Sequence, residues 1–163
     1  MLKRILLILL IILVAIQFIR PARNISAISS SNDITKQYEV PDTVWKIMQV
    51  SCNDCHTNNT IYPWYTNIQP VGWWMQWHVN EGKQHLNFSE FASYKPAKKY
   101  DKLKETVKLV KEDDMPLNSY LWIHHDAKLT PGQKNLIIDW ATGLKNRIAI
   151  ENNIVDTATF RHD

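Results

Sequence analysis

The chain has 163 residues, a formal net charge of +3, and 45% hydrophobic against 21% charged residues. This length accommodates one compact domain with appendages. The small positive charge gives no support for a nucleic-acid partner. No internal repeat or low-complexity tract stands out, so a repeat architecture is not expected.

The chain begins with two basic residues, Lys3 and Arg4, followed by an apolar run over residues 5–19. This order is typical of an export signal. A good small-x-small cleavage triplet is missing, since residues 27–29 fit the pattern but lie far past the apolar run. We therefore predict an uncleaved signal-anchor or transmembrane segment over residues 1–22, although the run is short for a full span. A cleaved signal peptide is the alternative.

Residues 23–39 are rich in Ser, Asn and Ile, with no apolar period, and predict a flexible linker. The domain itself is expected over residues 40–146, and residues 147–163 form a C-terminal tail with no strong signal. At the start of the domain, Asp42 can cap a short helix over residues 43–50. That helix leads directly into the most informative motif of the chain.

The motif is Cys52-Asn53-Asp54-Cys55-His56, a C-x-x-C-H pentapeptide that contains the only two cysteines. This spacing is the attachment signature of c-type haem, because two thiols join one edge of the porphyrin and the histidine turns onto the iron. A thioredoxin-like pair would need a βαβ pattern, and structural zinc usually needs four ligands. A plain disulfide is the remaining alternative. We predict one covalent haem c, with Cys52, Cys55 and His56 binding it.

Helical segments are predicted after the motif at residues 71–82, 89–91, 98–111 and 117–125. The last helix has the clearest start, with Thr130 at N-cap, Pro131 at N1 and Gln133 at N3 forming a capping box. Gly143 suits its C-terminal cap. No run of alternating strand pattern appears, so the domain is predicted to be all-α, a small helical fold around one haem.

The apolar positions predict which side chains face inward. Two inward stripes are expected, one on each of the last two long helices: Leu103, Val107 and Val110, and Leu136, Ile137 and Trp140. The seven tryptophans are an unusual number for so short a chain. Most of their rings are expected either to fill the core or to pack against the haem.

Met115, followed by Pro116, is the best candidate for the sixth iron ligand. A thioether suits haem iron, and His/Met ligation raises the reduction potential. A methionine that only fills a gap in the core is the alternative for Met115. His78 and His124 are competing ligands. One histidine of the pair His124-His125 is expected to be simply exposed, and His85 and His162 have no supporting context.

The order of a CxxCH motif, short helices, a Met-Pro loop and a final capped helix resembles a class I cytochrome c domain. The strings at residues 62–65, 86–89 and 115–117 make the chain similar to a narrower group, a bacterial haem-binding domain family with one CxxCH motif and often an N-terminal apolar tether. The resemblance covers about residues 40–144. It implies that Cys52 and Cys55 form thioethers, that His56 is the proximal ligand, and that Met115 matches the distal methionine.

The expected function is one-electron transfer by a membrane-tethered c-type haem protein, with no catalytic residues. A haem-based sensor, an accessory subunit, or a haem peroxidase with an open distal site are the alternatives. Haem c is attached outside the cytoplasm, so the domain is expected on the periplasmic side of the inner membrane, anchored by one span in membrane lipid. Lysines over residues 95–111 could steer an unidentified acidic redox partner, lie against anionic lipid, or form a solvated helix face.

Overall fold

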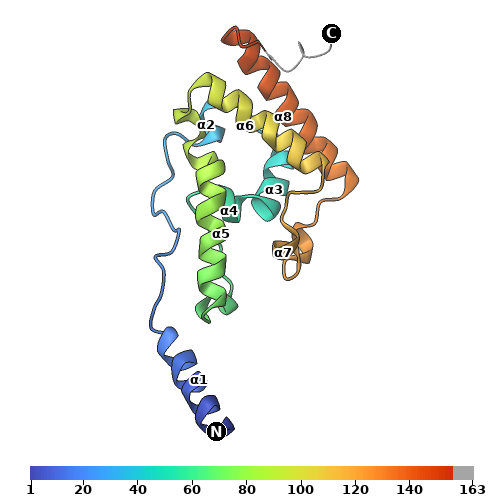
Figure 1. Cartoon of the computed structure of the whole chain (residues 1–163). Coiled ribbons are helices and arrows are strands. Elements are labelled where there is room, and N and C mark those ends of the chain that lie inside the picture. The colour runs from blue at the N-terminus through green and yellow to red at the C-terminus, as the bar shows by residue number, and fades with distance from the viewer. Residues whose placement is uncertain (156–163) are drawn as a thin grey trace, which may run out of the picture.

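The computed structural model describes residues 1–155, and these residues form an all-helical fold without a named β-strand (Figure 1). The all-α prediction is therefore confirmed. In chain order the helices are α1 (Leu2–Ile16), α2 (Ile34–Gln37), α3 (Asp42–Ser51), α4 (Asn53–His56), α5 (Val71–His85), α6 (Pro96–Lys111), α7 (Asn118–Leu121) and α8 (Pro131–Glu151). Three short 3-10 turns join them: η1 (Trp64–Asn67), η2 (Phe88–Ser93) and η3 (His125–Ala127).

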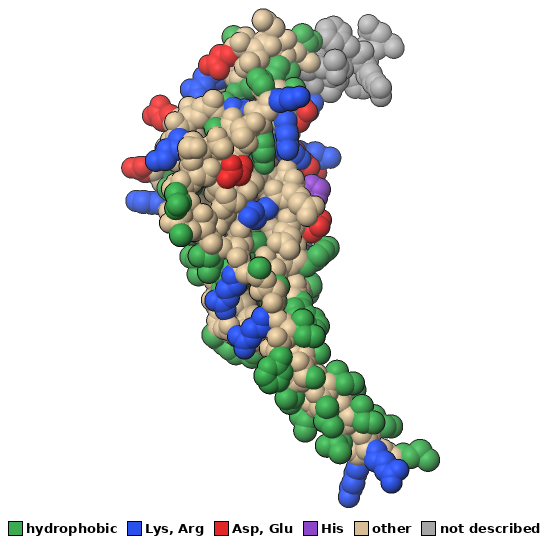
Figure 2. All heavy atoms as spheres, turned by 90° about the vertical axis from the view of Figure 1, so that its left-hand side faces the viewer, with side chains coloured by type: hydrophobic (Ala, Val, Ile, Leu, Met, Phe, Trp, Pro, Cys, Tyr) green, Lys and Arg blue, Asp and Glu red, His purple; other side chains and the backbone are tan. Residues whose placement is uncertain are grey.

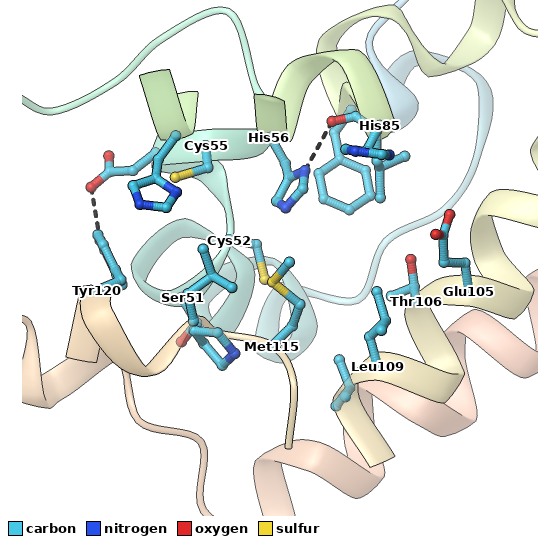
Figure 3. A pocket seen from close by; sticks show the side chains of 18 of the residues that line it. Ser51, Cys52, Cys55, His56, His85, Glu105, Thr106, Leu109, Met115 and Tyr120 are labelled. Atoms are coloured by element: carbon cyan, nitrogen blue, oxygen red, sulfur yellow. Dashed lines mark hydrogen bonds between the residues drawn. The ribbon is translucent and has the colours of Figure 1, made fainter. Parts of the chain in front are cut away.

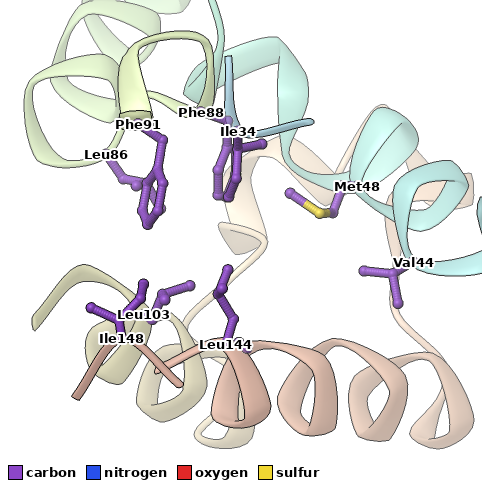
Figure 4. Close-up of a cluster of buried hydrophobic side chains, with 10 residues drawn as sticks. Ile34, Val44, Met48, Leu86, Phe88, Phe91, Leu103, Leu144 and Ile148 are labelled. Atoms are coloured by element: carbon purple, nitrogen blue, oxygen red, sulfur yellow. The ribbon is translucent and has the colours of Figure 1, made fainter. Parts of the chain in front are cut away.

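The core forms where α6 and α8 pack along each other and receive α2, α3 and η2 (Figure 1). Leu103 of α6 and Leu144 and Ile148 of α8 meet Phe88 and Phe91 from η2 in one buried cluster (Figure 4). Burial of these side chains supplies the main stabilising free energy of the domain. The core therefore fixes one end of α5, through η2, against the α6–α8 pair.

The capping box predicted for α8 is confirmed, because the Thr130 hydroxyl accepts from the Gln133 amide and the Gln133 side chain accepts from the Thr130 amide. The predicted end at Gly143 is wrong, since α8 continues to Glu151. Leu144 and Ile148 remain on the buried face, so their packing outweighs the cost of one glycine within the helix. At α3, Asp42 is the first helical residue and the N-cap is Pro41.

Residues 23–39 differ from the flexible linker that the sequence predicts. Asp33 caps α2 by accepting the Thr35 amide at 3.0 Å, and Ile34 is 0% exposed in the main core cluster. The Asn24 amide donates to the Tyr62 hydroxyl at 2.8 Å. The polar composition of this segment did not indicate these contacts, because its partners lie far away in the sequence.

The predictions about inward-facing side chains are confirmed only in part. Within residues 1–155 no tryptophan is fully buried, but Trp45 and Trp140 pack against the main core cluster. By contrast, Trp64, Trp77 and Trp122 are well exposed. Leu136 is also exposed, whereas Ile137 is buried as expected. The core instead consists mainly of aliphatic and phenylalanine side chains, which pack tightly without an N–H group to satisfy.

The apolar helix α1 projects away from the domain (Figure 1) and its side chains are exposed nearly all round in the described structure. Among residues 1–155, no helix is both long and apolar enough to cross a membrane.

Candidate functional site

A mainly apolar cavity of about 280 Å³ lies between α5 on one side and α3 and α6 on the other (Figure 3). Its walls come from α3, α4, α5, α6 and the segment that leads into α7. The lining residues include Ser51, Cys52, Asp54, Cys55, His56, His78, Glu81, Gly82, His85, Leu86, Phe88, Lys102, Glu105, Thr106, Leu109, Val110, Met115, Pro116, Leu117, Tyr120 and Leu129. The predicted haem-attachment motif and Met115 thus converge on one cavity, although they are about sixty positions apart in the chain.

A sharp turn between α3 and α4 brings the two thiols to the same cavity. Cys52 ends α3 and precedes α4, and its carbonyl accepts from the amides of Cys55 (3.2 Å) and His56 (3.0 Å). Both thiols are free. Burial raises the pKa of each thiol to about 12, so both are protonated and uncharged at neutral pH. The cavity therefore offers two reduced thiols in an apolar setting.

The His56 imidazole is held in one orientation by the backbone. Its Nδ1–H donates to the Leu86 carbonyl at 2.9 Å, and its ring meets the Phe88 ring edge-on with centroids 6.2 Å apart. Burial lowers the pKa of His56, which favours the neutral ring. With Nδ1 donating, Nε2 retains its lone pair, and a backbone carbonyl on the other ring nitrogen is the usual support of a metal-ligating histidine.

Met115 reaches the cavity from the loop between α6 and α7. Its amide donates to the Leu109 carbonyl at 3.2 Å, which folds the loop back over the end of α6. Figure 3 shows the Met115 side chain and the His56 ring at the cavity, on different elements of the fold. The structure therefore places a thioether among the residues that the sequence singled out.

The two alternative ligands, His78 and His124, differ in whether they reach the cavity. His78 lines the cavity from α5, and its Nε2 is buried with no hydrogen-bond partner among the described residues. His124 does not line the cavity. Its Nε2 is 2.9 Å from the Tyr65 hydroxyl, and its ring stacks on Tyr120 with centroids 4.0 Å apart. Of the two, only His78 has a free nitrogen at the cavity.

The remaining histidines are less informative. His85 lines the cavity near the end of α5, although it is not among the predicted ligands. His125 is exposed, and His162 lies outside the described residues.

Three cavity residues were not anticipated from the sequence. The Tyr120 hydroxyl donates to Asp54 Oδ2 at 2.8 Å, and Asp54 Oδ1 accepts the Ile61 amide at 2.9 Å. Burial, together with the Asp54 carboxylate, raises the pKa of Tyr120 above its ordinary value.

At Gly82, an added Cβ would lie 2.6 Å from the Cys55 carbonyl oxygen. A glycine in the middle of a helix costs stability and is the one sequence signal of this close approach.

The donor set and the walls fit a haem. Two thiols, one oriented imidazole and one thioether face an apolar cavity, and one buried ring nitrogen lacks a partner. In agreement with this chemistry, residues 11–143 match the family model of the haem-binding domain. The chain belongs to the haem-binding domain family. No curated protein and no solved structure matches it.

As a haem-binding domain, the chain is a haem protein, and the matched region contains every residue named above as lining the cavity. The match begins within α1 and ends within α8. It therefore includes residues 23–39, which pack against the domain in the structure.

Proposed function

We propose that this haem-binding domain holds one covalent haem c through Cys52 and Cys55, with His56 as an axial ligand. Cys52 and Cys55 would hold the group by thioether bonds, in which each thiol would add across one vinyl double bond, its sulfur going to one carbon and its hydrogen to the other. The observation that carries the proposal is the hydrogen bond from His56 Nδ1 to the Leu86 carbonyl. It leaves Nε2 available beside two free thiols in one apolar cavity.

The second part of the proposal assigns one-electron transfer to this site, with Met115 as the sixth ligand. Haem iron, when bound, supplies a one-electron couple, and a thioether ligand favours its reduced state. The walls are mainly apolar, and apolar groups rearrange little when the charge of the site changes, which lowers the cost of reorganisation. Among the described lining residues there is no arginine that could assist peroxide cleavage.

His78 supports a second candidate. Its unpartnered Nε2 is at the cavity, so it could replace Met115 as the sixth ligand and give a bis-histidine site of lower potential. Such a site would suit a sensor or an accessory subunit.

We further propose that α1 attaches the protein to the inner membrane with the haem domain on the periplasmic side. Two observations support this. The side chains of α1 are apolar and exposed, and Lys3 and Arg4 precede most of its apolar surface. The attachment of haem c outside the cytoplasm sets the orientation.

The haem proposal is tested by maturing the full chain in a host that makes c-type cytochromes. Haem should stay with the wild-type protein through acid-acetone extraction, and the variant carrying Cys52→Ala and Cys55→Ala should lose it. The reduced wild type should bind carbon monoxide slowly, since its sixth position is filled. Freely extractable wild-type haem contradicts the covalent link, and a five-coordinate wild type that turns over peroxide would make the protein a peroxidase.

The attachment to membrane is tested separately. A periplasmic reporter fused after Asp163 should be active, and full-length protein should remain in membranes after a high-salt wash. Full-length protein in the washed soluble fraction contradicts the anchor, and a mature N-terminus near Ser30 shows cleavage instead.

A further inference from the structure

Five large apolar side chains gather where the domain meets α1, on η1, the loop after it and the first half of α5. We call this group the aromatic corner: Trp64, Ile68, Val71, Trp74 and Trp77. Their exposed fractions run from 37% for Val71 to 74% for Trp64. An isolated exposed apolar residue needs no explanation, but five large ones within fourteen residues of chain favour an interaction surface.

The aromatic corner is joined to α1 by hydrogen bonds. The Gln17 side chain pairs with the Gln69 backbone, donating from Nε2 to the carbonyl at 3.1 Å and accepting the amide at 2.9 Å. The Trp73 indole N–H donates to the Ile19 carbonyl at 2.7 Å. Residues 17–19, just after α1, are therefore fixed to Gln69 and Trp73, the sequence neighbours of the corner residues Ile68 and Trp74.

The dimensions of α1 explain why the corner would meet lipid. A helix of fifteen residues is about 22 Å long at ~1.5 Å per residue, whereas the hydrocarbon core of a bilayer is about 30 Å thick. A helix that is too short draws its flanking residues towards the bilayer or thins it. Tryptophan is the side chain that prefers the interface between hydrocarbon and headgroups.

Charge at the junction agrees with a lipid surface. Arg20 and Arg23 follow α1 directly, and Figure 2 shows Lys and Arg side chains between the hydrophobic α1 and the body of the domain. The Arg23 guanidinium donates to Asn67 at 2.6 Å and lies over the Tyr62 ring, 5.0 Å from its centroid. A basic group this close to the end of α1 could interact with the phosphates of anionic lipid.

From these observations we propose that the aromatic corner rests in the headgroup region of the same bilayer that holds α1. The haem domain would then have a fixed orientation on the membrane, with the cavity above the surface, instead of moving freely on a tether. This inference rests on the membrane attachment proposed above and is independent of the haem chemistry.

The test is hydroxyl-radical footprinting of the full chain in nanodiscs of phosphatidylcholine and phosphatidylglycerol, with one copy per disc. Ile150, 79% exposed near the far end of α8, is the internal reference for Trp64. After division by the intrinsic reactivity of each side chain, Trp64 should be oxidised severalfold more slowly than Ile150. A Trp64→Gln, Ile68→Gln variant should show greater oxidation of Trp74 and Trp77, and an Ile150→Gln variant should not.

Three results would overturn the proposal. Equal corrected rates at Trp64 and Ile150 in nanodisc-bound protein would show that the corner is in water while the attachment stands. Protection that grows with the number of copies per disc would assign the corner to a second copy of the chain. Protein that leaves the discs would refute the attachment as well. None of these outcomes depends on whether haem is bound, so they are separate from a failure of the haem proposal.

Discussion

The two halves of α5 carry opposite surfaces. The second half turns His78, Glu81, Gly82 and His85 towards the cavity, whereas the first half exposes Trp74 and Trp77. Polarity alone would suggest the reverse, with the large rings inside and the polar side chains outside. The difference shows that the cavity is built by the close approach of backbone at Gly82 and by aliphatic side chains from α6. Trp74 and Trp77 contact the His78 ring but keep 39% and 56% of their surface exposed, so they can also meet another surface.

The largest expected effect concerns the sixth iron ligand. If Met115 is not that ligand, the contrast between the two halves of α5 must be revised. Met115→Ala should abolish the weak near-infrared thioether-to-iron band of the oxidised protein, lower the potential and let carbon monoxide bind the reduced haem quickly. His78→Ala should leave that band in place, which makes it the matched control. If His78→Ala opens the iron and Met115→Ala changes nothing, the second half of α5 supplies the ligand and the bis-histidine candidate takes precedence.

A second prediction uses the two glycines of α5. Gly82→Ala should destabilise the protein by about 1–3 kcal/mol, since the new Cβ would overlap the Cys55 carbonyl. Gly72→Ala should also destabilise it, because its Cβ would overlap the Thr66 carbonyl. Only Gly82→Ala should shift the haem absorption spectrum. Thermal unfolding followed by circular dichroism measures the first effect, and a visible spectrum measures the second.

Gly143 provides the control for these glycines. A Cβ added at Gly143 in α8 would meet nothing within 4 Å. Gly143→Ala should therefore stabilise the protein by about 0.5–1 kcal/mol through helix propensity. If Gly82→Ala and Gly143→Ala change the stability by the same amount, close contact between residue 82 and the Cys55 carbonyl does not shape the cavity.

A third prediction concerns alkaline pH. The pKa of Tyr120 is raised in the folded protein, chiefly by burial and then by Asp54, from an ordinary value of 10.0. Below pH 10 the tyrosine is protonated in both states and its contribution is complete. As the pH rises above 10, the unfolded chain releases the proton while the folded protein retains it, so stability falls. Tyr120→Phe should have a flatter alkaline profile of denaturant unfolding, and an unchanged slope would contradict the buried hydrogen bond to Asp54.

The smallest effect is expected at the aromatic corner, at Trp64 of η1. In detergent, Trp64→Gln should change the free energy of unfolding by less than about 0.5 kcal/mol, as is usual for an exposed side chain. The buried Leu103 is the contrast, and Leu103→Ala should cost about 2–5 kcal/mol. Urea unfolding of both variants measures the difference. A large loss on Trp64→Gln would mean that the corner belongs to the core and would weaken its assignment to lipid.

Part of the site was predictable from local sequence. Cys52, Cys55 and His56 lie within one short turn, so their spacing alone brings them to one cavity. The Thr130 cap is likewise local, because its partner is three residues away. Met115 was selected by its chemistry and its place in the chain, and the structure brings its side chain to the same cavity. The Tyr120–Asp54 hydrogen bond joins residues sixty-six positions apart and could not be predicted from spacing.

Sequence by itself determined the helical character of the chain, the short turn that carries the C-x-x-C-H motif and the start of the last helix, because each depends on residues within one or two turns. Only the tertiary structure decided that His78 lines the cavity while His124 bonds to Tyr65, and that α8 runs past Gly143. It also decided which tryptophans are exposed, namely Trp64, Trp74, Trp77 and Trp122. These features depend on which surfaces meet after the chain has folded. Hydrophobicity favours burial of a side chain, but it does not specify the surface against which that side chain packs.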